Sequence, residues 1–569
     1  MLSLSNIFNR TFFIRSIGSF FLLLVFCTSC EDFLEPKSQS EFIPKTAEQM
    51  NELIVSAIPE PTNSPSLTGG LLDLVTDDIA TLDRYIDPRN PAEDLWYSQS
   101  YIFGVYGMYS WQPDYSTYMQ SNGYWSYDLY SGIYNKLVYV NAPLDYMDKV
   151  SGSDELKNYV RAQAYTLRAF YYLHLVNIYG VPYSSAPNGP GIPIRTTASK
   201  ENRKMTRNTV GEVYDLIVTD LQEAISLFEN VEPSYQYRQF RPTLPMALLL
   251  LSRTYLYMEN WEQAAFYAQK LIDEWPQFQI KNLNDVIREG NTNVHTTDAS
   301  ADADLKRKQT FYKDFLTYNN PDVIWLYSKA ADMVMLTAKE MTSSTRLQNN
   351  QTYAMITHAS NDLLNCYDDK DLRLATYFVR DLFGEPAYTD GGADAPTRPA
   401  RNYHAYGKMQ IRDDGSGIPA INVQRFIPVD DSRTYGQALR ITEAYLILAE
   451  AKAMLGLPQE AVNALTSLWN NRFAAGTPSS YSAGTDVVTL VRNERRREFC
   501  FEALRWFDLR RWGMPRMEHV WYSTSNGTRQ TFVLEKNDPG YTFPMPIDIL
   551  TANPDLSQVP LAGDSRNPM

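Results

Sequence analysis

Apolar residues recur at three- and four-residue steps in several stretches of the chain, which is the spacing of an amphipathic helix. The longest of these stretches covers residues 155–179 and stops at Gly180 and Pro182. Another begins near Thr209 and ends before Pro233. These stretches predict a protein that is mainly α-helical.

Residues 245–276 are predicted to form a helical hairpin whose turn lies at Glu259 and Asn260. Small residues in such a hairpin let two helices approach, and large ones fill the gap between hairpins. Five positions follow the tetratricopeptide pattern of large, small, aromatic, alanine and proline residues: Leu251, Ser252, Tyr255, Ala264 and Pro276. A weaker copy covers residues 441–472, with comparable places taken by Leu448, Ala449, Gly456, Ala461, Leu465 and Leu468.

The two hairpins are far apart in the sequence, so they cannot form a simple uninterrupted repeat. Residues 277–435 lie between them and are rich in Asn, Asp, Gly and Thr. Short runs with β propensity, such as residues 323–327, indicate a few strands in otherwise irregular structure. The predicted fold class is therefore mainly α, with tetratricopeptide-like hairpins and a large irregular insert that carries loops and a few short strands.

The last predicted helix covers residues 487–512 and combines many arginines with acids at three- to four-residue steps. The arginine-rich run at residues 492–497 raises the alternative of a phosphate site. Acids at helical spacing pair with arginines on the same helix. The pattern therefore favours ion pairs within the protein over a phosphate site.

The chain is acidic, with a formal net charge of −14 from 66 Asp and Glu against 52 Lys and Arg. Nucleic acids and anionic lipid surfaces bind excess Lys and Arg, so this balance speaks against both as partners. Hydrophobic residues make up 44% of the chain, which is ample for a packed core. Outside the N-terminal segment the cysteines are Cys366 and Cys500, for which we expect two buried thiols, with one disulfide as the alternative.

The N-terminal segment has the order of a signal peptide, with arginines ahead of an apolar run at residues 17–27. A membrane-spanning helix needs about 20 apolar residues, so this run is too short to remain as a span. Thr28 and Ser29 lead into Cys30, which resembles a bacterial lipobox, although Cys27 stands where such signals prefer Leu. We predict cleavage after residue 29 and lipidation of Cys30, with a plain secretory signal as the alternative.

Together these segments resemble the SusD/RagB family of outer-membrane lipoproteins of Bacteroidetes. The matching stretches follow the family's order along the chain, at residues 30–36, 167–182, 209–225, 245–276, 441–456, 493–513 and 543–558. The resemblance implies one SusD-like domain from residue 30 to 569. Its helical scaffold would cover about 126–276 and 436–515, and its irregular ligand-side regions about 60–125 and 277–435.

The same resemblance implies a partner and a location. Members of the family face a SusC-like TonB-dependent transporter with their helical side and carry the ligand site in the irregular half. The lipidated cysteine of such proteins carries three acyl chains, so Cys30 would anchor the chain in the outer membrane. Glu31 and Asp32 resemble the acidic signal that exports such lipoproteins to the cell surface.

Motifs of catalytic or metal sites are missing from the sequence: there is no H-E-x-x-H, G-x-S-x-G, Walker A or G-x-G-x-x-G. Asp298, Asp302 and Asp304 lack the Gly and terminal Glu of an EF-hand, so we expect a solvated loop there. The five histidines have no ligand spacing and are expected to be structural or solvated: His174, His295, His358, His404 and His519. We therefore predict no enzyme, no metal and no cofactor.

An aromatic cluster broken by prolines is the best candidate for a ligand site. Aromatic rings stack on the C–H face of a pyranose, and polar neighbours bond its hydroxyls. The alternative is that these rings pack the core under the loops, which we expect for Trp125, Tyr130, Tyr134 and Trp325. The candidate ligand-binding residues are Arg84, Tyr85, Trp96, Tyr97, Trp111 and Tyr115.

These observations lead to one functional hypothesis and three alternatives. We expect a non-enzymatic surface lipoprotein that captures an oligosaccharide and passes it to the transporter. A peptide-capturing RagB-like lid would favour groups that pair with backbone over ring stacking. A glycosidase would need two carboxylates at a suitable separation, and the sequence gives no reason to pick a pair. A tetratricopeptide scaffold that binds only a protein is the remaining alternative.

Overall fold

The computed structural model describes residues 44–60, 69–81, 106–115, 129–199, 205–236, 240–289, 315–329, 357–385, 388–389, 397–398, 401–406, 435–481, 486–522, 528–558 and 565–569. The chain divides into two compact units, Met1–Lys45 and Thr46–Met569, and every described element belongs to the second. The predicted signal peptide and Cys30 lie outside the described residues.

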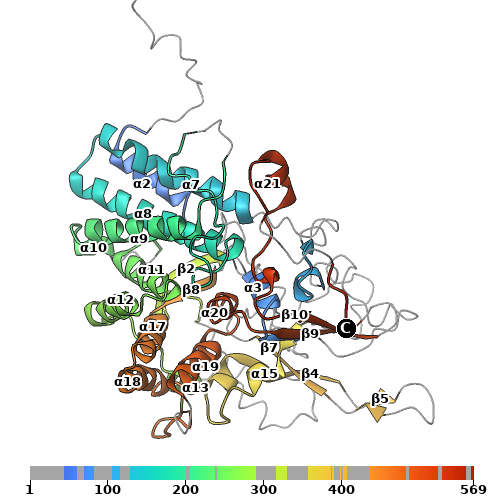
Figure 1. The fold of residues 1–569 in the computed structure, drawn as a ribbon. Helices are drawn as coiled ribbons and strands as arrows, with labels where there is room; N and C mark the ends of the chain where they lie inside the picture. The colour runs from blue at the N-terminus through green and yellow to red at the C-terminus, as the bar shows by residue number, and fades with distance from the viewer. Residues whose placement is uncertain are drawn as a thin grey trace, which may run out of the picture. The chain divides into compact units, whose positions relative to one another are not determined.

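A series of helices forms one side of the second unit (Figure 1). Each helix packs against the next in chain order, even where long segments separate them in the sequence. The helices of this scaffold are α2 (Ala47–Val55), α7 (Leu129–Tyr146), α8 (Asp154–Tyr179), α9 (Val210–Phe228), α11 (Leu244–Tyr257), α12 (Trp261–Glu274), α17 (Ile441–Met454), α18 (Pro458–Trp469) and α19 (Val487–Phe499).

Local capping groups set where two of the predicted helices begin. The Ser153 hydroxyl accepts from the backbone N–H of Leu156 at the start of α8. Thr209 and Glu212 form a reciprocal capping box at the start of α9. Both starts lie within one or two residues of the sequence prediction, which the structure confirms.

The two predicted hairpins are confirmed, and the structure places them side by side. Helices α11 and α12 form the first hairpin and α17 and α18 the second, with α12 packed against α17. Within the first hairpin, the buried Ser252 hydroxyl donates to the Ala264 carbonyl at 3.0 Å, so the small residues do allow a close approach. The repeat is therefore continuous in space and interrupted only in sequence.

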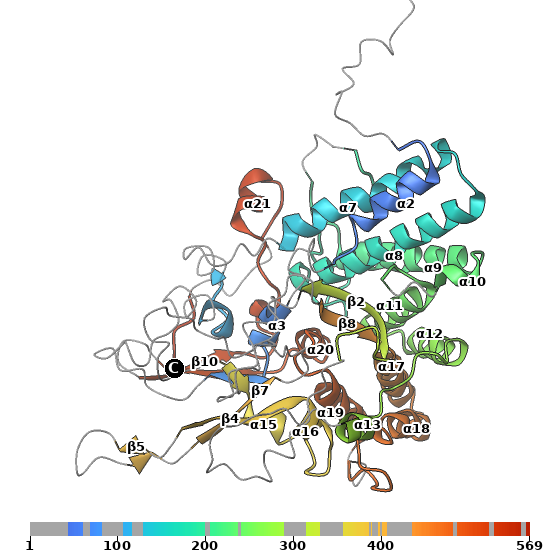
Figure 2. The same ribbon diagram turned by 180° about the vertical axis from the view of Figure 1, so that it is seen from behind.

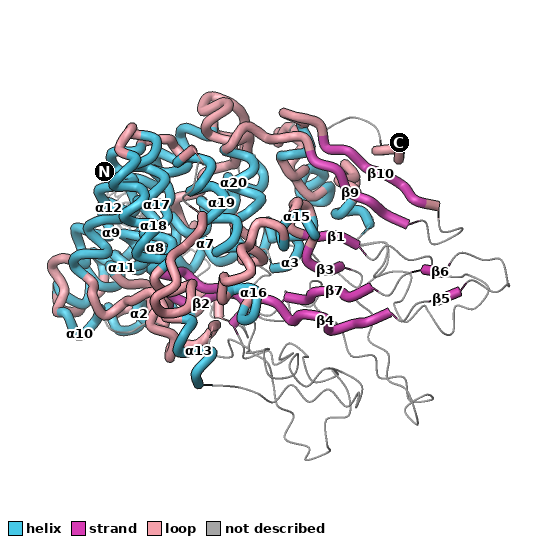
Figure 3. The backbone as a smooth tube through the Cα atoms, turned by 90° about the horizontal axis from the view of Figure 1, so that it is seen from below, coloured by secondary structure: helices cyan, strands magenta, loops and turns pink. Residues whose placement is uncertain are grey.

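Short two-stranded pairs occupy much of the described insert and the region after α19 (Figure 3). The five pairs in the described part of the chain are all antiparallel: β1 (Ile79–Thr81) with β3 (Thr357–Ala359), β2 (Val323–Lys329) with β8 (Tyr435–Arg440), β4 (Phe378–Glu385) with β7 (Arg401–Tyr406), β5 (Tyr388–Thr389) with β6 (Thr397–Arg398), and β9 (Met517–Tyr522) with β10 (Arg529–Leu534). The described residues also form short helices: α3 (Gly69–Leu74), α10 (Pro233–Gln236), α13 (Leu283–Glu289), α15 (Asn361–Leu364), α16 (Arg373–Thr376), α20 (Arg505–Arg511) and α21 (Ile547–Ala552). The mainly helical fold class with a few short strands is confirmed.

The pair of β2 and β8 joins the insert to the scaffold (Figure 2). Trp325 of β2 has no exposed surface, so its predicted place in the core is confirmed. Just before β2, the carboxylate of Asp322 accepts from the backbone N–H of Thr442 at 2.9 Å. This contact supplies the N-terminal cap that α17 lacks from its own residues.

The predicted single helix over residues 487–512 is wrong in one respect. It consists of α19 and α20, separated by a break at residues 500–504. Phe501 and Ala503 have φ values of 60° and 57° there, in the left-handed region that ends a helix. The break turns the chain so that Arg495 of α19 reaches Asp508 of α20, with a nitrogen–oxygen distance of 3.1 Å.

No helix among the described residues is long and apolar enough to cross a membrane.

Candidate functional site

Only two of the six candidate ligand-binding residues lie in the described part of the chain. Trp111 and Tyr115 belong to residues 106–115, whereas Arg84, Tyr85, Trp96 and Tyr97 lie outside the described residues. Residues 106–115 pack on β9 and β10, where Tyr106 meets Trp521 and Phe532 edge to face. We refer to residues 106–115, β9, β10 and residues 565–569 as the aromatic end.

Trp111 is held in the interior of the aromatic end. Its side chain is 6% exposed, and its indole N–H donates to the Val75 carbonyl at 3.0 Å. The indole stacks on the imidazole of His519 with ring centroids 4.0 Å apart. The backbone of Trp111 has a φ of 51°, which is rare for a bulky residue.

His519 lies between two aromatic rings, because Tyr109 stacks on its other face at 4.1 Å. Its Nδ1 is 2.6 Å from the Tyr109 carbonyl oxygen, and its Nε2 is 2.9 Å from the Thr76 carbonyl oxygen. Burial lowers the pKa of His519 to about 4. His519 is thus a buried structural histidine, one of the two roles expected for it, and no sequence pattern indicated that it would lie between two aromatic rings.

Tyr115 is also buried, and its ring meets Phe543 edge to face with centroids 5.4 Å apart. Burial raises the pKa of its hydroxyl well above the usual value. A cavity of about 20 Å³ lies beside Trp111 and Tyr115, which is room for about one water molecule and too little for a sugar ring. This packing favours the alternative that both rings belong to the core, and contact with a ligand stays a prediction.

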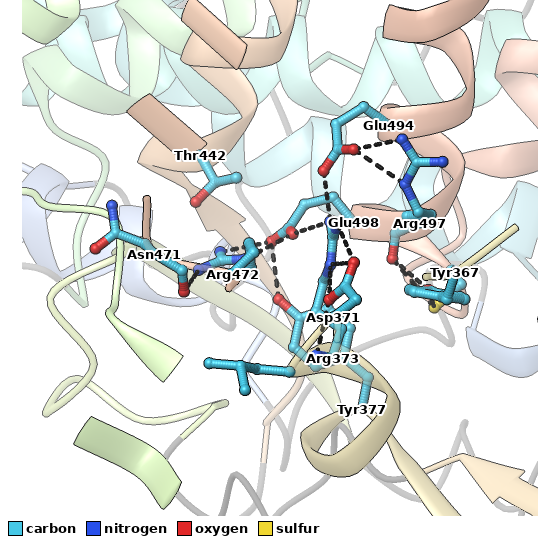
Figure 4. A network of polar contacts seen from close by, with 12 residues as sticks. Tyr367, Asp371, Arg373, Tyr377, Thr442, Asn471, Arg472, Glu494, Arg497 and Glu498 are labelled. Carbon is cyan, nitrogen blue, oxygen red and sulfur yellow. Dashed lines mark hydrogen bonds and ion pairs between the residues drawn. The ribbon is translucent and has the colours of Figure 1, made fainter. Parts of the chain in front are cut away.

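A network of buried ion pairs centres on α19 (Figure 4). The Glu498 carboxylate, which has no exposed surface, accepts from the guanidinium groups of Arg373, Arg440 and Arg472 at 2.9–3.1 Å. The hydroxyl of Tyr377 donates to the same carboxylate at 2.9 Å. Although burial alone would raise the pKa of Glu498, these arginines hold it well below its usual range.

Neighbouring residues of α19 extend the network. Glu494 accepts from Arg373 and Arg497, both at 2.6 Å, and these arginines lower its pKa to about 2 against the effect of burial. On another side of the helix, Arg496 binds Asp78 at 2.7 Å.

The arginine-rich run thus has carboxylate partners inside the protein, as predicted, but most of these acids are distant in sequence. Arg497 and Glu494 do follow the expected helical spacing. Arg495, Arg496 and Arg497 are each less than 8% exposed and paired with acids, which leaves them little room to bind phosphate. Of the two alternatives, the structure supports internal ion pairs.

The described part of the chain contains no cluster of side chains that could bind a metal ion and no disulfide. No group of three or more His, Cys, Asp or Glu in these residues is placed to hold a metal ion. His174 is buried, with its Nδ1 2.9 Å from the Phe170 carbonyl oxygen, in a structural role. No disulfide joins Cys366 and Cys500; Cys500 is fully buried, as expected, whereas the expectation of a buried thiol is wrong for Cys366, which is partly exposed.

Two family models match the chain on either side of the insert. Residues 32–256 match a SusD-like model described as "Starch-binding associating with outer membrane". Residues 428–561 match the SusD/RagB model, described as "SusD family". The intervening residues 257–427 contain most of the predicted ligand-side insert, where the sequence resemblance was also poor.

Individual relatives agree with these matches. SusD-like protein P25 of Formosa agariphila is 23% identical over 570 residues, which cover 95% of this chain and 98% of that protein. A SusD-like carbohydrate binding protein from Bacteroides vulgatus superposes with a TM-score of 0.56 at 19% identity, over 90% of this chain and 98% of that one. A SusD superfamily protein from Bacteroides thetaiotaomicron gives a TM-score of 0.58 at 19% identity, over 90% and 100%. At such identities the solved structures establish the fold.

Proposed function

The chain belongs to the SusD/RagB family, and from this membership we propose that it is a surface lipoprotein that captures a glycan and delivers it to a SusC-like TonB-dependent transporter. The observation that carries the proposal is the pair of family matches, one of which is described as starch-binding. The carbohydrate-binding name of a relative with the same fold also supports a sugar as the ligand.

The buried carboxylates support a role without catalysis. A glycosidase needs an acid whose pKa is raised and which the substrate can reach. Arginines instead lower the pKa of Glu494 and Glu498. Burial raises the pKa of Asp78 and Asp220, but both are at most 1% exposed and each is paired with an arginine.

Titration with a panel of oligosaccharides, followed by intrinsic tryptophan fluorescence, tests glycan capture. We expect a saturable change that Trp96→Ala abolishes, because Trp96 lies in the proline-broken aromatic segment. Trp261→Ala is the matched control, since Trp261 begins α12 in the helical scaffold and should leave the titration unchanged. No response to any glycan would count against the proposal, and recovery of peptides by mass spectrometry would favour the RagB-like alternative.

The anchor and the partner need a separate experiment in the native membrane. Cys30→Ser should leave an unprocessed precursor that no longer co-purifies with a transporter barrel in mild detergent. Normal processing of this variant would contradict the lipid anchor.

The glycosidase alternative has its own test. Release of reducing ends from a bound glycan would establish that alternative in place of capture without catalysis.

A further inference from the structure

A groove with a volume of about 640 Å³ lies on the helical scaffold, lined by α12 and the end of α17. These two helices pack side by side where the two hairpins stack (Figure 1). Binding sites for ligands commonly have volumes of about 300–1,000 Å³. The groove is therefore large enough to receive several side chains of a partner, and no residue of the aromatic end lines it.

The lining of the groove is more apolar than polar. Ala265, Phe266 and Leu455 contribute to it, and the side chain of Phe266 is 58% exposed. Met454 and Leu457, on either side of Leu455 in the chain, are each more than a third exposed. Single exposed apolar side chains are ordinary, but several of them together mark an interaction site.

Phe266 stands on the polar face of an amphipathic helix. The buried face of α12 includes Ala268 and Leu271. Phe266 lies on the other face, four residues after Glu262 and three before Gln269, which also line the groove. Packing of the hydrophobic core therefore does not account for an aromatic ring at this position.

The groove carries an excess of negative charge, because the carboxylates of Glu262, Asp273 and Glu274 line it. Two lysines also line it, but each forms an ion pair with a carboxylate beyond the lining, at 2.8 and 2.7 Å: Lys270 with Glu229, and Lys452 with Glu460. Complementary charge selects the partner of an interface and speeds its association. The groove is therefore complementary to a basic partner with an apolar side chain.

The same charges disfavour other occupants. A second copy of this chain would bring a net charge of −14 toward three carboxylates, and nucleic acids or anionic lipids would meet the same repulsion. The lining follows α12 from Glu262 to Glu274, which is about 18 Å at the helical rise per residue. A partner helix of about three turns has that length, and helices dock in apolar grooves through side chains at such steps.

We propose that this groove docks a basic amphipathic helix of another protein. An aliphatic or aromatic side chain of that helix packs against Phe266. Lys or Arg residues on either side of it face the carboxylate of Glu262 at one end of the groove and those of Asp273 and Glu274 at the other. The interaction does not depend on the proposed glycan capture, because it uses residues of the scaffold alone.

Photo-cross-linking in envelopes of cells that express the full chain tests the proposal. A benzophenone maleimide attached to Gln269→Cys, an exposed position in the groove, should cross-link a peptide that mass spectrometry can sequence. We expect a peptide of another protein in which Lys or Arg residues flank an aliphatic or aromatic residue. The chain without this substitution reports the background from the partly exposed Cys366.

In the Gln269→Cys background, Phe266→Asp should reduce the yield of this peptide about tenfold, as expected for the anchor of an interface. Tyr139→Asp is the matched control, because Tyr139 is a similarly exposed ring on α7, and it should leave the yield unchanged. Both variants should keep the Tm within a few degrees. If Phe266→Asp unfolds the protein, the charge reversals Glu262→Lys and Glu274→Lys together should cause the same loss.

Three results would overturn the proposal: no cross-linked peptide above background, a peptide from a second copy of this chain, or a peptide that is acidic. An unchanged yield in a folded Phe266→Asp variant would overturn it as well.

Discussion

Glu498 is the residue on which the buried ion pairs of the described core converge. Its carboxylate binds arginines from α16, from β8 and from the turn after α18, so one side chain ties three separate segments to α19. A buried pair of charges gains little over apolar packing, but the removal of one partner leaves the others uncompensated in a medium of low dielectric constant.

The Glu498→Gln variant should therefore lose about 3–5 kcal/mol of unfolding free energy, measured by urea denaturation. Glu460→Gln removes a carboxylate from the exposed pair with Lys452 and should cost less than about 1 kcal/mol. Similar losses in the two variants would show that the buried network contributes no more than a surface ion pair.

Trp111 shows how much of a single residue's role can be predicted from the sequence. Its residue type and its proline-broken surroundings predicted contact with a ligand, which stays a prediction, whereas the structure packs it among aromatic rings. Its burial against His519 depends on β9, which lies roughly 400 residues along the chain from Trp111 and which no local pattern connects with it.

Both helical hairpins turn through the same backbone motif with different residues. After α11, the N–H of Asn260 donates to the Tyr255 carbonyl, and Glu259 has a φ of 60°. After α17, the N–H of Leu457 donates to the Lys452 carbonyl, and Gly456 has a φ of 73°. This is the Schellman motif, in which glycine avoids the steric cost of a left-handed residue.

Exchange of the residue type at these two positions should change stability in opposite directions. Glu259→Gly relieves the left-handed cost at an exposed position and should add about 0.5–1 kcal/mol to the unfolding free energy. Gly456→Ala should lose a similar amount, about 0.5–1 kcal/mol, through strain alone, because a Cβ there meets nothing within 4 Å. Thermal unfolding followed by circular dichroism measures both, and equal signs would contradict the shared motif.

The end of α19 shows where the helical spacing of residues leads to a wrong prediction. The pattern of residues 487–512 is helical throughout, yet the helix ends at Phe499. The break brings Asp508 against Arg495 and places Glu502 against Arg440. These tertiary ion pairs outweigh the local preference for one continuous helix, and a reading of helical spacing cannot detect them.

For the whole molecule, the buried carboxylates set the response to acid. The folded pKa of Glu494 is about 2, and the pKa values of Glu498 and Asp508 are also lowered by their arginines. A carboxylate whose pKa is lower in the folded than in the unfolded protein stabilises the fold. This stabilisation is complete above the unfolded pKa near 4.5 and is lost as the pH falls through the folded pKa. The unfolding free energy should therefore decrease between about pH 4.5 and 2.

Urea denaturation at pH 7, 4.5, 3 and 2 measures this decrease. Glu494→Gln should be less stable at pH 7 and should lose less between pH 4.5 and 2, because it lacks the group that titrates. If the variant and the wild type lose the same free energy over this range, Glu494 does not contribute to the acid response.

What the sequence determined by itself is local. The spacing of apolar residues predicted α8, α9 and both hairpins, with starts within one or two residues of the observed ones, because the interactions that form a helix act within about four residues. The order of the segments was enough to identify the family.

Only the tertiary structure decided which distant groups meet. It stacked α12 on α17, paired Arg496 with Asp78, and brought Arg566 to the Trp111 carbonyl. Such contacts depend on how the packed helices and strand pairs place backbone that is far apart in the chain, and side chains of ordinary type then complete them. The type of a residue therefore determined which hydrogen bonds or ion pairs its side chain can form, and the packing of the fold determined with which distant residue it forms them.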